Sequence, residues 1–195
     1  GLVDNPDVDH YRLASHLMTA FITFAYTLWV ALDLIFPTKK EINIALRNFI
    51  RLALAVLLLQ IIYGAFVAGL DAGFIHNHWP IMSEGKFIHE TVFIEQHPWY
   101  KNFIEGKSGV QFVHRMVAYL VVIFIIAIWQ KTRKITLTVM QKRGVNALLI
   151  MVGIQFILGV FTILYQVPVW LGVAHQVGAF FLLSTMIFTL HRFSK

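Results

Sequence analysis

Three histidines lie inside long apolar stretches of the chain: His16, His114 and His175. Each follows the expected start of its helix by about five residues, a depth of about 7 Å at a helical rise of about 1.5 Å per residue. Ionisable side chains are rare inside membrane spans because burying them is costly, and they usually mark functional sites. A purely structural role, with a hydrogen bond to a neighbouring helix, stays open for any single one of them. Three imidazoles at matched depth favour a cofactor site.

Axial ligation of haem iron is the chemistry that such imidazoles suit, because two side chains from different helices can face each other across the ring. His114 and His175 meet this requirement if their helices are neighbours. Small residues flank both and leave room for a macrocycle: Gly109, Gly172, Ala174, Gly178 and Ala179. Arg115 is a candidate partner for haem propionates, since a guanidinium matches carboxylate geometry. An interface anchor is the other reading of Arg115.

Zinc is the competing metal, but zinc prefers four ligands, which often include cysteine or carboxylate. The chain has no cysteine, and no carboxylate accompanies the three histidines within their apolar stretches. One long connection contains four more histidines: His76, His78, His89 and His97. The pair at 76 and 78 is only a weak metal signal, and the sequence assigns no role to these four residues.

The composition indicates a membrane protein. Of the 195 residues, 58% are hydrophobic and only 13% are charged, and the mean hydropathy is +0.70. Soluble domains have roughly 25% charged residues, and a chain of this length leaves much of its surface exposed. The composition therefore excludes a disordered chain, a collagen and a soluble enzyme. The absence of cysteine excludes disulfides and cysteine-ligated clusters.

Five stretches are long enough to span a bilayer, which requires about 20 mostly apolar residues. The runs 13–32 and 52–70 contain no charged residue, and 108–130 contains only Arg115. The uncharged run 144–191 is too long for one helix, and a turn at 166–168 divides it. We expect helices at 11–36, 47–70, 109–130, 144–165 and 170–190. The predicted fold is an all-α integral membrane protein with five transmembrane helices.

Eleven of the 16 basic residues fall on one side of these spans: Lys39, Lys40, Arg47, Arg51, Lys131, Arg133, Lys134, Lys142, Arg143, Arg192 and Lys195. Lys- and Arg-rich connections face the cytoplasm. The net charge of +6 is therefore a topology signal, and we exclude nucleic acid as a partner. The histidine layer and the long loop at 71–107 are expected at the outer face.

A weak internal repeat, His-x-x-x-Ala-Phe, begins at both His16 and His175. It suggests that 47–195 forms a four-helix haem-binding unit, with the long outer loop at 71–107. Residues 1–36 would then be the outer linker and last helix of a preceding unit, joined by a cytoplasmic linker at 37–46. Because the chain opens at Gly1 without an initiator Met or a signal-peptide pattern, we expect that preceding unit to be mostly missing.

Four stretches of the chain resemble the haem A synthases of bacterial and mitochondrial inner membranes. They are YRLASHL at 11–17, GAFVAGLDAG at 64–73, VQFVHR at 110–115 and AHQ at 174–176. The run at 64–73 is the most specific of these, and the likeness covers nearly the whole chain. The family has eight spans in two four-helix halves, so this chain is similar to the last span of the first half plus the whole second half.

The resemblance implies an oxidoreductase that converts a methyl group of haem O into the formyl group of haem A, for terminal oxidase assembly. His114 and His175 would hold a haem B, and His16 would match a ligand of the substrate haem O. The family's catalytic glutamate and the other first-half histidine would precede Gly1, so no catalytic residue is assigned and the chain alone is expected to be inactive.

The implied location is the bacterial inner membrane, where the partners are the lipid bilayer, haem O, haem O synthase and an electron acceptor. Two alternatives remain open at this point. A cytochrome b-type electron carrier would use the same ligands without modifying haem. A binding or assembly subunit would use the histidines structurally.

Overall fold

The computed structural model describes residues 9–36, 43–83 and 85–194, and its long elements are five α-helices. All five are long and apolar enough to cross a membrane, which confirms the predicted all-α membrane fold. The helices are α1 (His10–Ile35), α2 (Ile44–Gly69), α3 (Lys107–Thr132), α4 (Val139–Leu164) and α5 (Val169–Arg192).

Capping side chains explain where several helices begin. Asp9 and Asn43 each accept a hydrogen bond from a backbone N–H in the first turn of α1 and α2, which satisfies a donor that the helix itself leaves unpaired. Thr138 and Gln141 form a reciprocal capping box at the start of α4. The predicted start of this helix at 144 was therefore wrong by five residues, because an uncharged run carries no information about caps.

The turn between α4 and α5 lies where the sequence predicted it. Gln166 and Val167 both adopt left-handed backbone conformations, with φ of 58° and 56°. The N–H of Val167 donates back to Thr162 O at 2.7 Å, and Pro168 is the N-cap of α5. The chain thus reverses direction within three residues and brings α5 back along α4.

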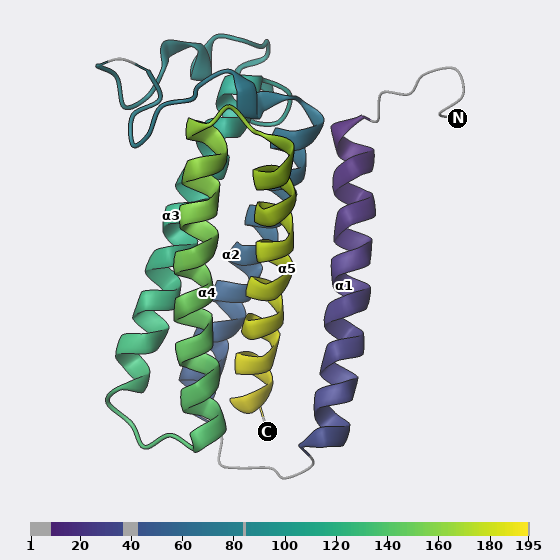
Figure 1. The fold of residues 1–195 in the computed structure, drawn as a ribbon, viewed down its shortest axis with the longest axis vertical. Coiled ribbons are helices and arrows are strands. Elements are labelled where there is room, and N and C mark those ends of the chain that lie inside the picture. Colours follow the sequence, from purple (N-terminus) through teal and green to yellow (C-terminus); the bar gives the residue numbers. More distant parts are fainter. Residues whose placement is uncertain (1–8, 37–42, 84, 195) are drawn as a thin grey trace.

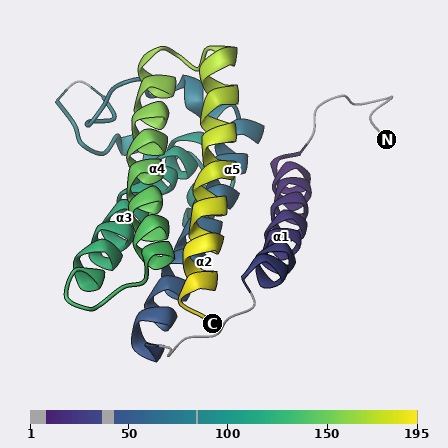
Figure 2. The same ribbon diagram turned by 60° about the horizontal axis from the view of Figure 1, so that its bottom comes forward.

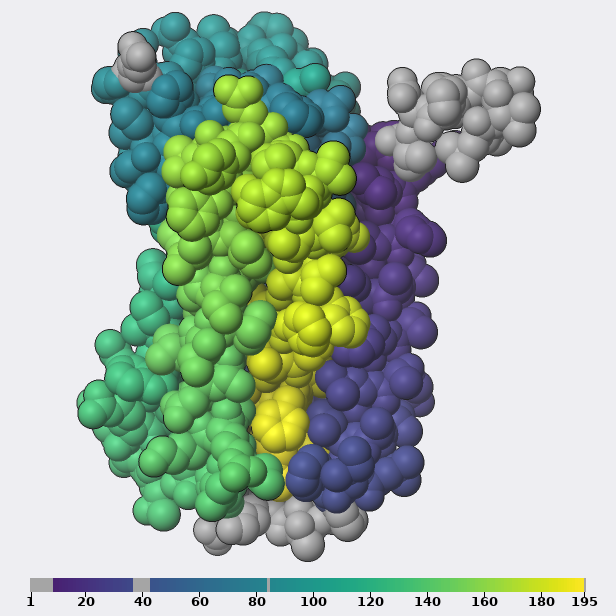
Figure 3. Space-filling view, viewed as in Figure 1, coloured from purple at the N-terminus to yellow at the C-terminus, as the bar shows by residue number. Residues whose placement is uncertain are grey.

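Helices α2 to α5 form a closed ring in which α2 packs on α3, α3 on α4, α4 on α5, and α5 on α2. Figure 1 shows these four helices running up and down side by side, with α1 standing beside the ring. Figure 2 shows the same arrangement from a second direction. Helix α1 packs against α2 and α5, and in Figure 3 it lies along the side of α5.

The two ends of the ring are packed differently. At the end away from the long loop, the interior holds large, fully buried apolar side chains: Ile50, Ile125, Ile128, Leu148, Leu183 and Met186. At the loop end, several facing positions hold glycine or alanine instead, and a cavity remains. The interior of the ring is therefore packed with side chains at one end and encloses a cavity at the other.

The long loop, residues 70–106 between α2 and α3, folds over the open end of the ring (Figure 1). It contains three short 3-10 helices, Ala72–Phe74, Glu90–Phe93 and Trp99–Phe103. The fully buried Asn102 organises the loop, because its side chain bonds backbone groups of residues 93, 96 and 99. Asn102 thus ties three backbone segments of the loop together.

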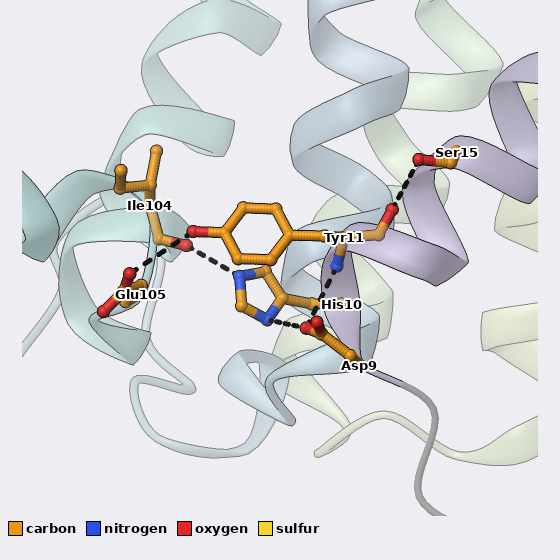
Figure 4. A network of polar contacts seen from close by, with 6 residues as sticks. All are labelled: Asp9, His10, Tyr11, Ser15, Ile104 and Glu105. Carbon is orange, nitrogen blue, oxygen red and sulfur yellow. Dashed lines mark hydrogen bonds and ion pairs between the residues drawn. The ribbon is translucent and has the colours of Figure 1, made fainter.

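Both ends of α1 are tied to the rest of the molecule. At the loop end, His10 Nε2 donates to Ile104 O at 3.0 Å and its Nδ1 lies 3.1 Å from an Asp9 carboxylate oxygen (Figure 4). At the other end, Asp33 Oδ1 lies 2.8 Å from Nε2 of the fully buried His191 on α5. The predicted linker at 37–46 falls largely on 37–42, outside the described residues, so the division into domains stays a prediction.

Candidate functional site

A cavity of about 440 Å³ lies inside the ring, at the end that the long loop covers. All five helices contribute to its wall, and α1 supplies the apolar residues Leu13, Leu17 and Phe21. The lining is mostly apolar, with a small number of polar side chains. Small-molecule and cofactor sites typically have volumes of about 300–1,000 Å³ and this kind of lining. The cavity therefore has the size and character of a ligand site.

His114 on α3 and His175 on α5 both line this cavity. The condition that their helices be neighbours was wrong, because α3 and α5 are diagonal partners in the ring and pack mainly on α2 and α4. The diagonal arrangement still presents both imidazoles to one space. A flat group held between them would contact all four helices of the ring.

Each imidazole contacts a glutamine on the helix that precedes its own. Gln60 Nε2 on α2 lies 3.3 Å from His114 Nε2, and Gln155 Nε2 on α4 lies 3.5 Å from His175 Nε2. Both glutamines line the cavity. Sequence reasoning missed them, although the signal was present: each glutamine is followed four residues later by a glycine.

Those two glycines make room for the imidazoles. A Cβ atom at Gly64 would lie 3.4 Å from His114 Cε1, and one at Gly159 would lie 2.9 Å from His175 Cε1. Separations near 3 Å are too short for unstrained carbon contacts, since these are optimal at about 3.5–4.0 Å. Each histidine therefore rests against bare backbone on its neighbouring helix.

Several polar atoms on the cavity-lining residues are buried without a hydrogen-bond partner: Gln60 Oε1, Gln111 Oε1, Gln155 Oε1, His114 Nδ1, His175 Nδ1 and Arg115 Nε. Leaving such a group unsatisfied costs about 1–3 kcal/mol, so polar atoms of this kind gathered around one cavity mark it as a functional site. Two imidazoles on opposite sides of an apolar space are the donor set that haem iron takes as axial ligands. The residues present fit a haem.

Arg115 has a definite structural partner, the long loop. Its terminal nitrogens donate to the backbone carbonyls of His76, His78 and Ile81, and the side chain is buried. These bonds hold the loop over the cavity mouth, and only Nε is left without a partner. The predicted contact between Arg115 and a propionate stays a prediction.

His16 does not line the cavity. His16 is exposed on α1, whereas the neighbouring residues Leu13 and Leu17 of the same helix line the cavity. Depth in the membrane was the basis for grouping His16 with the other two histidines. The structure brings together His114 and His175 and leaves His16 facing outward.

The loop histidines form a different cluster. His76 is buried, its Nε2 lies 3.0 Å from Ser108 Oγ, and its ring centroid lies 4.8 Å from that of His89, with the two rings tilted by 39°. Burial is the main cause that lowers the pKa of His76 from 6.5 to about 4, followed by repulsion from His89. Within 9–36, 43–83 and 85–194, no three His, Asp or Glu side chains are placed to hold one metal ion.

Comparison with known proteins gives consistent matches along the chain. The family model COX15-CtaA, described as cytochrome oxidase assembly protein, matches residues 1–187. The chain is 62% identical over 195 residues to a protein of Flavobacterium psychrophilum and 65% identical over 197 residues to one of Flavobacterium johnsoniae. A protein of Nitrosospira multiformis is 39% identical over 199 residues, and all three are named "Heme A synthase".

Each of these alignments covers 100% of the chain, but only 58% of each Flavobacterium relative and 55% of the Nitrosospira relative. The chain thus spans little more than half the length of the curated relatives it matches. A family model that covers residues 1–187 leaves no doubt about kinship: the chain belongs to the COX15-CtaA family of cytochrome oxidase assembly proteins.

Proposed function

We propose that this chain is the haem-holding part of a haem A synthase, the enzyme that oxidises a methyl group of haem O to the formyl group of haem A. His114 and His175 are the axial ligands of a haem B in this proposal. The observation that carries it is the pair of imidazoles facing one apolar cavity from opposite helices. The relatives named "Heme A synthase" support the reaction.

When bound, a haem B supplies one-electron chemistry at a potential that its ligands and surroundings set. The residues of the cavity hold the group, exclude water and fix its orientation. His114 and His175 would both hold the iron in this proposal, and a haem held by two imidazoles would carry electrons rather than bind oxygen or substrate. We therefore assign electron transfer to this cavity and the methyl oxidation to a separate site.

We assign His16 to that separate site, as a ligand of the substrate haem O. It is exposed on α1 and does not line the cavity, so the substrate haem would meet a different part of the α1 surface from the haem in the cavity. Haem O synthase is the proposed supplier of substrate, and an electron acceptor is the second proposed partner.

The proposed setting is the bacterial inner membrane, crossed by the five helices. The distribution of basic residues supports an orientation in which the haem cavity and the long loop face outward, since Lys- and Arg-rich connections stay in the cytoplasm. Haem that lies near the outer face can exchange electrons with partners on that side.

The experiment is a reduced-minus-oxidised absorption spectrum of the protein, expressed at its natural length and purified in detergent. His114→Ala and His175→Ala should each abolish the six-coordinate spectrum of this haem. The matched control is His97→Ala, which removes an exposed histidine of the long loop and should leave the spectrum unchanged. Haem bound unchanged in His114→Ala would refute the proposed ligation.

A cytochrome b-type electron carrier would use the same two ligands, and the filled axial positions favour that reading of the cavity taken alone. Haem extraction separates the two functions. A haem A synthase makes haem A from haem O in cells that contain haem O synthase, and a His114→Ala variant should accumulate haem O. An electron carrier leaves the haem composition of the cell unchanged.

A further inference from the structure

The contact between glutamine, glycine and histidine occurs twice in the ring. Gln60 and Gly64 on α2 contact His114, and Gln155 and Gly159 on α4 contact His175 in the same way. In both places the glutamine amide approaches Nε2 of the ring, while a glycine one turn later lies against Cε1. A contact that recurs between two separate helix pairs points to a common role toward the histidine.

The orientation of the Gln155 amide is fixed by a second hydrogen bond. Its Nε2 donates to the backbone carbonyl of His175 at 3.0 Å, so the nitrogen of the amide must face α5. Gly178 leaves the space for this arrangement, because a side chain there would collide with Gln155 Oε1. The same amide nitrogen lies 3.5 Å from His175 Nε2.

An amide nitrogen can only donate, so the ring nitrogen that faces it must accept. His175 Nε2 therefore carries a lone pair, and in a neutral imidazole the proton is then on Nδ1. The hydrogen bond made at one ring nitrogen decides the protonation of the other. The tautomer with an unprotonated Nε2 is the one that can bind iron through that nitrogen.

We propose that Gln155, with Gln60 as its counterpart, is a positioning residue that holds the ring of its histidine in the iron-accepting tautomer before haem enters. This inference rests on the proposed haem-holding function. The long contact at Nε2 is easily given up to iron, while the bond from Gln155 to the His175 carbonyl remains and keeps the amide in place. The cavity is thus preorganised for its cofactor.

Three variants of Gln155 separate the roles of shape and hydrogen bonding. Gln155→Glu keeps the size and, when ionised, offers only acceptors, which favours a proton on His175 Nε2. Gln155→Met keeps the length and makes no hydrogen bond. Gln130→Glu, the same change at an exposed position of α3, is the control. Loss of a group that orients a metal ligand typically costs about 10–100-fold in affinity.

The first measurement is the 15N spectrum of histidine in protein made under haem limitation, with the His175 signals identified by their loss in His175→Asn. The wild type should show an unprotonated Nε2 and a protonated Nδ1. Gln155→Glu should show a protonated Nε2, and Gln155→Met a mixture. A protonated Nε2 in the wild type would overturn the inference, and this readout needs no haem.

The second measurement is the rate of haem uptake by the same haem-free protein, followed by absorption. Gln155→Glu should slow uptake by at least about 10-fold, Gln155→Met by less, and Gln130→Glu should match the wild type. Equal rates in Gln155→Glu and the wild type would overturn the inference while leaving the proposed function intact. If the wild type itself takes up no haem, the proposed function fails instead. If Gln155→Glu does not fold, the wild-type 15N spectrum and Gln155→Met decide the question.

Discussion

Gly159 lies directly against the imidazole of His175, so close that a Cβ atom at residue 159 would be 2.9 Å from His175 Cε1. The corresponding separation at Gly64 and His114 is 3.4 Å. The two glycine–imidazole contacts therefore have the same arrangement, but the contact at His175 is closer than the contact at His114. The ring of His175 has less space to move than the ring of His114.

We predict that Gly159→Ala displaces His175 and lowers haem content strongly, whereas Gly64→Ala has a smaller effect. Overpacking of this kind costs about 1–3 kcal/mol, which corresponds to roughly 5- to 150-fold in affinity. Haem titration of both variants measures the difference.

Gly153→Ala on the same helix is the control, because a Cβ there meets nothing within 4 Å. It should bind haem as the wild type does and gain slightly in stability from the better helix propensity of alanine. Equal haem affinity in Gly159→Ala and Gly153→Ala would show that residue 159 does not constrain the ligand.

A second prediction concerns Arg115 and the long loop. Arg115→Met removes the donors to three loop carbonyls and should weaken the closed loop by on the order of 3 kcal/mol. Hydrogen exchange of residues 76–81 should rise, and haem should dissociate faster because the cavity mouth opens. Arg133→Met, at the exposed C-cap at the far end of α3, should change neither.

The same variant tests the propionate contact expected from the sequence. If Arg115 acts only on haem, Arg115→Met will release haem while the exchange of residues 76–81 stays unchanged. Arg115→Lys sharpens the comparison, because lysine keeps the charge but cannot reproduce the planar set of donors. Restored haem binding with an open loop in that variant would favour the propionate role.

The sequence predicted those features that depend on position along the membrane normal. Apolar runs fixed the number of spans, and the turn at Gln166 and Val167 divided the longest run as expected. His114 and His175, which were expected at one depth, both line the cavity at the loop end of the ring. Hydropathy measures depth well because the bilayer interior excludes charge along one direction only.

Rotation about a helix axis and order around the ring could not be predicted in the same way. Lipid-facing and helix-facing surfaces are both apolar in a membrane, so hydropathy does not distinguish them. The outward direction of His16 and the diagonal placement of α3 and α5 depend on small residues and polar contacts between helices. For the same reason the sequence indicated no role for Gln60 and Gln155, because the role of a glutamine in a span depends on which helix its side chain faces.

The third prediction is a pH dependence of the long loop that comes from His76. Burial, together with His89 and Arg115, lowers its pKa from 6.5 to about 4, while Glu95 opposes and His78 adds to this shift. Between about pH 4 and 6.5 the opened loop binds a proton at His76 and the closed loop does not. Closure is therefore fully stable above pH 6.5 and loses up to about 3 kcal/mol as the pH falls toward 4.

Hydrogen exchange of residues 70–106, corrected for the intrinsic effect of pH, measures this loss. His76→Gln should remove most of the dependence between pH 4 and 6.5, because it removes the titrating ring. His97→Gln, at an exposed position of the same loop, should retain it. A wild-type loop that opens as its pH is raised through this range would contradict the assigned sign.

The last prediction separates His16 from the cavity. Because His16 is exposed on α1 and is not among the residues that line the cavity, His16→Ala should leave the haem held by His114 and His175 intact. The absorption spectrum of this haem should stay the same in His16→Ala. The rate of haem uptake should change by less than about twofold, well below the roughly 10-fold effect typical of a group that orients a metal ligand. Haem A formation should nevertheless fall to background if His16 binds the substrate haem. A His16→Ala spectrum that matches His175→Ala would require α1 to turn its other face to the ring when haem binds.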